Sequence, residues 1–308
     1  MRDSLRLGKI AGISIGLHWS IALIAALFTV SLAGTILPAS APGASPVAYT
    51  VVAAITAVAF FASIVAHELG HSIVARNNGV GIEGITLFAL GGVAKLESEP
   101  DDAGVAGRIA LAGPAVSVVL GIAGLALGAT VTAIGVPQLI AAALTWLGII
   151  NFSLALFNML PALPLDGGRA LQAFLWNRNG DKHGATIRAA SVGRLIGFGL
   201  VAFGTWQFLS GGGAGLWTAV IGWFIASSAR SEAVRARIQK ERERWATQGA
   251  PLGGMPFGPF GAAFNFQAPN GPAPTPPQWP GFNPVDEHHS GSNPPPPSVI
   301  DVEGHRVS

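Results

Sequence analysis

Residues 50–75 read TVVAAITAVAFFASIVAHELGHSIVA, an apolar run long enough to cross a hydrocarbon layer of about 30 Å as one helix. The run contains an H-E-x-x-H pattern as His67-Glu68-Leu69-Gly70-His71. On a helix, histidines four residues apart share one face, where both imidazoles can bind a single zinc ion. Glu68 projects about 100° around the helix axis from His67, which suits a general base better than a third ligand. The stretch therefore predicts a membrane-spanning helix that carries a metal-binding pair.

The composition extends the membrane interpretation to the whole chain. Half of the 308 residues are apolar and 11% are charged, whereas soluble domains carry about 25% charged residues, so a water-soluble globule is not expected. The chain has no cysteine, which excludes disulfides, thiolate metal ligands and a cysteine nucleophile. Its formal net charge is +2, and the cations lie in short clusters beside the apolar runs. This placement predicts a lipid bilayer as the partner of these charges, and no nucleic acid.

Six apolar runs are candidates for membrane spans, and the distribution of charge predicts their orientation. The predicted spans are residues 13–37, 50–75, 105–134, 138–160, 191–210 and 214–229. The connections 38–49, 135–137 and 211–213 contain no charged residue, whereas the two ends and the other connections contain Lys and Arg. The positive-inside rule therefore predicts a multi-pass protein with both termini in the cytoplasm.

Changes in composition divide the chain into four predicted parts. Residues 1–12 form a cytoplasmic N-terminus, 13–230 a six-helix domain, 231–247 a basic juxtamembrane helix, and 248–308 a disordered tail. The tail is rich in Gly and Pro and is either a polyproline ligand for a partner or a solvated extension. The first span imitates a signal peptide, but its apolar run is about twice the usual length, so we expect it to stay in the protein.

Short apolar segments between the second and third spans predict a β-hairpin at about residues 80–97. Gly91 and Gly92 lie between these segments and suit a tight turn. Such a hairpin is either a structural lid or a sheet edge that binds an extended peptide by adding a strand. The alternating residues Ile13–Leu17 predict a further strand. The expected fold class is an all-α polytopic membrane protein with a small membrane-associated sheet.

Asp166 is the candidate for a third zinc ligand. A catalytic zinc usually has three protein ligands, and apart from Glu68 no Asp or Glu lies within a predicted span. The second and fourth spans run in the same direction, so His71 and Asp166 both arrive near the cytoplasmic side. The alternative is a helix stop with a capping Asp, which the neighbouring prolines and glycines also explain. A divalent cation would offset the two acidic groups, which are costly at bilayer depth.

Three segments resemble the site-2 protease family of intramembrane zinc metalloproteases. They are HELGH at 67–71, LAGP at 111–114 and NMLPALPLDGGR at 158–169, and they follow the family's order. The resemblance covers about residues 8–230. It implies a zinc metalloendopeptidase that cleaves transmembrane segments of membrane-anchored substrates, with one zinc per chain bound by His67, His71 and Asp166 and with Glu68 activating water.

The resemblance also implies a role for Asn158, a location and a substrate class. Asn158 matches the Asn of the family's fourth-span motif and either stabilises the oxyanion or forms a helix–helix hydrogen bond. Six spans and His18 resemble the branch that carries a C-terminal CBS nucleotide-sensing module, but a Gly/Pro-rich tail stands in its place. We expect His18 to be an interfacial or packing residue. The implied location is the inner (plasma) membrane, and the implied substrate is a regulator such as an anti-sigma factor.

Two other classes of function remain open. One is a noncatalytic membrane metal site, in a zinc transporter or in a retired protease that serves as a binding partner. A transporter would more often show internal repeats and polar residues along several spans. The other is a different membrane metalloprotease with a Glu as third ligand, for which Glu232, after the predicted sixth span, is the candidate.

Overall fold

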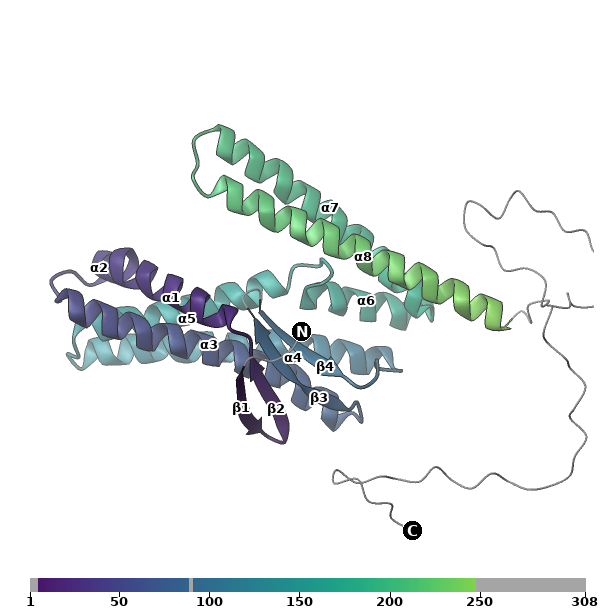
Figure 1. Ribbon diagram of the computed structural model, residues 1–308, viewed down its shortest axis with the longest axis horizontal. Coiled ribbons are helices and arrows are strands. Elements are labelled where there is room, and N and C mark those ends of the chain that lie inside the picture. Colours follow the sequence, from purple (N-terminus) through teal and green to yellow (C-terminus); the bar gives the residue numbers. More distant parts are fainter. Residues whose placement is uncertain (1–4, 89–90, 248–308) are drawn as a thin grey trace, which may run out of the picture. The chain divides into compact units, whose positions relative to one another are not determined.

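The computed structural model describes residues 5–88 and 91–247, and most of these residues are helical (Figure 1). The predicted tail, 248–308, lies outside the described residues. The helices are α1 (Ser20–Ser31), a π-helical stretch η1 (Leu32–Ile36), α2 (Leu37–Ser40), α3 (Pro46–Asn77), α4 (Ala103–Ala133), α5 (Gln138–Asn158), α6 (Asp166–Asn179), α7 (Lys182–Leu209) and α8 (Gly215–Thr247). The strands are β1 (Leu5–Ile10), β2 (Ile13–Leu17), β3 (Ile82–Phe88) and β4 (Gly91–Leu96).

Five helical stretches in the described part of the chain are long and apolar enough to cross a membrane. They are Ser20–Ser40, Pro46–Asn77, Ala103–Ala133, Gln138–Asn158 and Lys182–Leu209. They overlap the first five predicted spans. The sixth predicted span, 214–229, forms the first half of α8, which does not reach the same length of apolar sequence. The reason is that Arg230 and Glu232 follow closely, so the apolar part of α8 is short.

Side-chain caps and glycines determine where the helices that carry the site begin and how closely they pack. The Ser45 hydroxyl accepts a hydrogen bond from the Ala48 N–H and starts α3, and the Asp102 carboxylate accepts one from the Val105 N–H and starts α4. Where α4 crosses α5, a Cβ on Gly124 would lie 2.7 Å from the backbone of Gly148. The absence of side chains there lets the two backbones approach.

The same device joins α7 and α8 into an antiparallel pair (Figure 1). A Cβ on Gly204 would lie 2.4 Å from the Ala219 nitrogen, and one on Gly197 would lie 2.7 Å from the Ala226 nitrogen. The first half of α8 therefore returns along α7, although it is not among the five candidate spans.

A four-stranded sheet in the order β1-β2-β3-β4 lies beside the helices. Strands β1 and β2 are antiparallel, β2 and β3 are parallel, and β3 and β4 are antiparallel. The predicted strand at Ile13–Leu17 and the predicted hairpin are confirmed, whereas β1 falls in the part predicted as a cytoplasmic N-terminus.

The predicted Gly-Gly turn is wrong. Gly91 pairs with Phe88 and Gly92 pairs with Leu87, so both glycines belong to β4. The connection between the strands falls at residues 89–90, outside the described residues. Gly92 is needed because β4 closely approaches the side chain of Glu68 on α3.

The sheet is anchored on α3 just before the H-E-x-x-H pattern. Ile15 and Leu87 are buried together with Ile21, and Phe61 and Ile64 of α3 pack against them. This apolar contact holds β3 and its partner β4 next to the turn of α3 that carries Glu68.

Candidate metal centre

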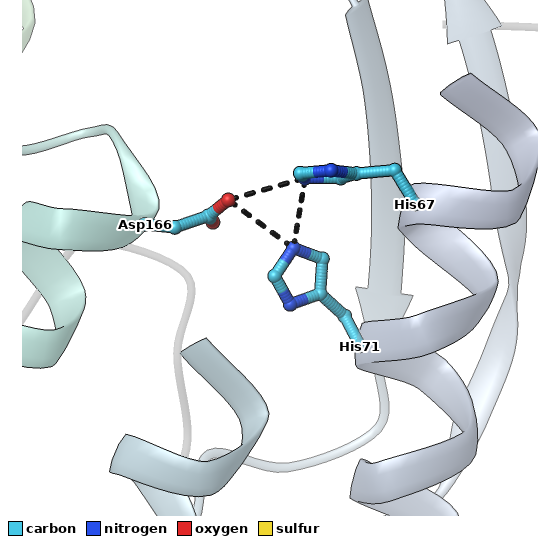
Figure 2. A group of neighbouring side chains, drawn as sticks. All are labelled: His67, His71 and Asp166. Carbon is cyan, nitrogen blue, oxygen red and sulfur yellow. Dashed lines mark hydrogen bonds and ion pairs between the residues drawn. The ribbon is translucent and has the colours of Figure 1, made fainter. Parts of the chain in front are cut away.

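His67, His71 and Asp166 converge on one point (Figure 2). The Asp166 Oδ2 atom lies 3.2 Å from His67 Nε2 and 3.3 Å from His71 Nε2, and the two Nε2 atoms are 3.2 Å apart. Figure 2 shows the carboxylate reaching from the start of α6 toward the imidazoles on consecutive turns of α3. These are the three residues predicted as metal ligands.

Helix α4 fixes the orientation of both imidazoles. His71 Nδ1 lies 2.6 Å from the Ile109 carbonyl oxygen, which can only accept, so Nδ1 carries a proton and Nε2 is the ring nitrogen that faces the centre. His67 Nδ1 lies 2.8 Å from the buried Ser117 hydroxyl. Metal-binding histidines almost always have such a partner on the second ring nitrogen. The hydrogen bonds therefore prepare both Nε2 atoms for a shared cation.

The three ligand atoms are of the kinds that zinc binds in proteins. The two Nε2 atoms and the carboxylate oxygen lie at about the same distance from one another and form a compact triangle, here called the metal triangle. A dication would interact favourably with all three atoms. No soft thiolate is available, since the chain has no cysteine. Two imidazoles and one carboxylate leave a fourth position open, as in catalytic zinc sites.

A glycine of α4 leaves the space in which a metal would lie. A Cβ on Gly113 would lie 2.2 Å from His71 Nε2 and 2.6 Å from His67 Nε2. No real side chain fits there. Gly113 belongs to the segment LAGP, and Ser117 follows one turn later on the same helix. Neither residue was predicted to have a role; the signals in the sequence are a polar Ser and a Gly-Pro pair within an apolar span.

Asp166 follows an irregular connection between α5 and α6, and this connection positions it at the metal triangle. Helix α5 ends at Asn158 and α6 begins at Asp166. A Cβ on Gly167 would lie 2.2 Å from the Met159 carbonyl oxygen, and one on Gly168 would lie 2.3 Å from the Leu163 nitrogen. The connecting backbone therefore folds directly onto the first turn of α6. Asp166 is the first residue of α6 and part of the metal triangle. The alternative of a capping Asp is wrong, because Leu165 is the N-cap and no side chain caps this helix.

The Asp166 carboxylate is strongly acidic in this setting. Burial by itself would raise its pKa, but hydrogen bonds with His67 and His71 and the charge of both rings lower the pKa to about 2. The carboxylate is thus ionised and available as a ligand throughout the neutral range.

Glu68 lies between the metal triangle and the sheet. A Cβ on Gly92 of β4 would lie 2.4 Å from Glu68 Cγ and 3.0 Å from Glu68 Oε1. Strand β4 therefore covers this carboxylate at a position where only glycine fits, which explains the glycine that the sequence analysis assigned to a turn.

One cavity of about 560 Å³, here called the catalytic cavity, is lined by the metal triangle and Glu68. Its wall includes His67, Glu68, His71, Asp166 and Asn158. Most of the remaining wall is apolar and aromatic and comes from α1, α3, α5 and α8. In the part of the chain that the structure describes, no side-chain hydrogen bond links Asn158 to another helix.

The other candidate ligands lie elsewhere. Within residues 5–88 and 91–247, His67, His71 and Asp166 are the group of His, Asp and Glu donors close enough to share a metal ion. Glu232 lies 3.7 Å from Arg235 on its own helix and is not part of this group. His18 Nδ1 lies 2.9 Å from the Ser20 hydroxyl near the start of α1, also outside the group.

Comparisons with known proteins agree with this geometry. The sequence pattern of Peptidase family M50 matches residues 55–143 and 134–202. The chain is 44% identical over 241 residues to "Putative zinc metalloprotease Rip3" of Mycobacterium tuberculosis, covering 78% of this chain and 61% of that protein. It is 38% identical over 264 residues to "Putative zinc metalloprotease sll0528" of Synechocystis, covering 85% of this chain and 68% of that protein.

A solved structure, the site-2 protease from Methanocaldococcus jannaschii, aligns with 74% of this chain and 94% of its own at 32% identity and a TM-score of 0.48. The chain thus spans 61% of the length of Rip3 and 68% of the length of sll0528. Because the matched ranges contain all three residues of the metal triangle, and a relative aligns at 38% identity over 68% of its length, the chain belongs to peptidase family M50, the site-2 protease family of multi-pass membrane proteins.

Proposed function

We propose that the chain is an intramembrane zinc metalloendopeptidase that hydrolyses a peptide bond in, or at the edge of, a substrate's transmembrane segment. The observation that carries the proposal is the convergence of His67, His71 and Asp166 beside Glu68 in a largely apolar cavity. The printed names of Rip3 and sll0528, each a "Putative zinc metalloprotease", support the same activity here.

His67 and His71 would hold one zinc ion through Nε2, and Asp166 through its carboxylate. When bound, zinc supplies Lewis-acid polarisation of the scissile carbonyl and lowers the pKa of the attacking water. Ser117 and the Ile109 carbonyl keep the two rings in the orientation that this requires. Gly113 keeps the space between the rings free.

Glu68 is the proposed general base. Its carboxylate takes a proton from water while the water oxygen forms a bond to the carbonyl carbon. The carboxyl group then passes this proton to the nitrogen as the C–N bond breaks, which releases an amine and a carboxylate. We assign Asn158 to the oxyanion: its amide N–H would donate to the carbonyl oxygen as that atom gains negative charge, and Asn158 lines the same cavity.

A helical substrate must unwind before its carbonyls are accessible, and the sheet offers a partner for the unwound segment. Both edges of β3 are paired, with β2 on one side and β4 on the other. A substrate strand would therefore add to β4, which has a free edge among the described strands and lies against Glu68.

We further propose the topology and setting in which this occurs. The first half of α8 pairs with α7 and would serve as a sixth span, and the positive-inside rule would then put both termini in the cytoplasm. The six-helix domain would comprise residues 13–230, followed by the basic helix 231–247 and the tail 248–308. The location would be the inner (plasma) membrane, and the substrate a membrane-anchored regulator such as an anti-sigma factor. The Pro-rich tail would be either a polyproline ligand for a separate partner or a solvated extension.

Cleavage of a membrane-tethered reporter, measured together with bound zinc, tests the proposal. Glu68→Gln should retain zinc and lower cleavage by about 10²- to 10⁴-fold, because the base is lost and the ligands are kept. Asp166→Asn should lose both zinc and cleavage. Glu83→Gln, at an exposed glutamate of β3, is the matched control and should cleave normally.

The same experiment separates the alternative functions. Normal cleavage by Glu68→Gln would remove the assigned base. A wild-type protein that binds zinc, cleaves nothing and moves zinc across vesicle membranes would favour a transporter.

A further inference from the structure

A second cavity of about 380 Å³ adjoins the catalytic cavity. Ile109, Pro164 and Arg169 line both cavities, so the two share a wall at the start of α6. The second cavity does not include His67, Glu68 or His71. It is therefore a separate compartment that opens beside the catalytic groups, and we call it the polar cavity.

The walls of the two cavities differ in chemistry. Phe28, Phe60 and Phe61 are among the aromatic side chains that line the catalytic cavity. The polar cavity is lined about equally by apolar groups and by polar ones, and its charged and amide side chains include Glu99, Gln172, Lys182, His183, Glu232 and Gln239. A segment that passed from one cavity to the other would move from an apolar to a polar environment.

The polar cavity lies largely outside the candidate membrane spans. Glu99 and Pro100 belong to the connection between β4 and α4, and Trp176 belongs to α6, which is not a candidate span. Lys182 and His183 are the first two residues of the candidate span Lys182–Leu209, and the contribution of α8 comes from its charged half. By the positive-inside rule, these positions would lie on the side of the bilayer that carries the basic connections.

Most charged groups of this wall already have protein partners. Lys182 Nζ lies 2.9 Å from Glu99 Oε2 and donates to the Pro100 carbonyl oxygen at 3.0 Å. His183 Nε2 lies 2.8 Å from Glu243 Oε1. These contacts join the connection before α4, the start of α7 and the end of α8. The wall of the polar cavity is therefore held together by ion pairs and hydrogen bonds between three segments.

Arg169 is different from these neighbours. Its side chain has no hydrogen bond or ion pair within residues 5–88 and 91–247, and it is attracted to Glu68 only at longer range. It also lines both cavities. A guanidinium group therefore lies at the passage between the apolar and polar compartments with its donors available, in a geometry suited to a carboxylate.

We propose that the polar cavity is a substrate subsite. It binds the short polar segment that flanks the cleaved transmembrane segment on the basic side of the membrane, and Arg169 selects an acidic side chain in that flank. This inference rests on the proposed proteolytic function. The catalytic cavity would then bind the transmembrane part of the substrate, and the polar cavity would bind the part that lies outside the hydrocarbon layer.

Cleavage kinetics with matched substrates test the proposal. Two reporters with the same transmembrane segment differ by a single Asp or Asn in the flank. The Asp reporter should have a KM about fivefold lower, as expected for one charge-assisted hydrogen bond. In Arg169→Gln this preference ratio should fall to about one, because the remaining amide does not distinguish the two flanks by charge. Arg108→Gln is the control: Arg108 is exposed, donates to Asn78 and lines neither cavity, so the preference should persist.

A second variant tests the cavity independently of Arg169. Ala106 lines the polar cavity and not the catalytic cavity, so Ala106→Gln should raise the KM of flanked reporters more than that of a reporter truncated at the flank. If the polar cavity served only as a path for water to the catalytic groups, the opposite result is expected. Both variants would then lower kcat equally for every reporter, and KM would not depend on the flank. That result would overturn the subsite. Absence of cleavage by the wild-type protein would instead overturn the proposed function.

Discussion

The two sides of the metal centre are built in opposite ways. His67 and His71 come from consecutive turns of the uninterrupted helix α3, and α4 fixes their rings through Ser117 and the Ile109 carbonyl. Asp166 comes from the first turn of a short helix, behind a connection that packs onto Gly167 and Gly168. Helix periodicity determines the histidine side, whereas the aspartate side depends on backbone contacts made by its neighbours. Substitutions on the two sides should therefore fail in different ways.

The largest effect is expected at Gly113, on the histidine side. In Gly113→Ala the added methyl group would lie 2.2 Å from His71 Nε2 and 2.6 Å from His67 Nε2, so at least one ring must leave its position. We expect zinc affinity to fall at least about 100-fold, the upper end of what outer-shell changes cost, with little loss of helix content. Metal titration and circular dichroism would measure the two quantities. Gly199→Ala, where no atom lies within 4 Å of the added Cβ, is the control.

A smaller and different effect is expected at Gly167, on the aspartate side. Its added Cβ would lie 2.2 Å from the Met159 carbonyl oxygen, which is backbone and cannot turn away. Gly167→Ala should therefore displace the connection between α5 and α6 and lower zinc affinity about 10- to 100-fold. It should also lower the free energy of unfolding by about 1–3 kcal/mol. The comparison of the two sides would be wrong if this variant lost zinc without any loss of stability.

The smallest effect is expected at Ser117. Ser117→Ala removes the partner of His67 Nδ1 at 2.8 Å but leaves every ligand in place. Zinc affinity should fall about tenfold, the lower end of the range for outer-shell partners, because the ring is held less well. Ser153→Ala, at an exposed serine that donates to its own helix, should have no effect in the same titration. Equal affinities for the two variants would mean that α4 does not orient His67.

The difference between the two sides also sets how much of the site was predictable. The spacing of His67 and His71 is local, so one turn of helix was enough to identify both ligands and Glu68. Asp166 lies about a hundred residues further on and was found by the scarcity of acidic residues in apolar sequence. Ser117 and Gly113 could not be given roles, because their partners lie about 50 residues away in the sequence and nothing local marks them.

The errors in the fold have similar causes. Gly92 was interpreted as a turn residue because Gly-Gly between apolar segments usually marks a turn. Its actual constraint is the side chain of Glu68, from a different element. The sixth predicted span is helical, but its apolar part ends too early for α8 to qualify alone, and its packing along α7 through Gly197 and Gly204 is a tertiary feature.

The most direct test of the central claim is the zinc content of purified full-length protein in three forms: wild type, Glu68→Gln and Asp166→Ala. If His67, His71 and Asp166 share one zinc and Glu68 is not a ligand, the first two forms should carry one zinc per chain. Asp166→Ala should carry much less at the same free zinc concentration. Full occupancy in Asp166→Ala, with the protein folded, would contradict the account.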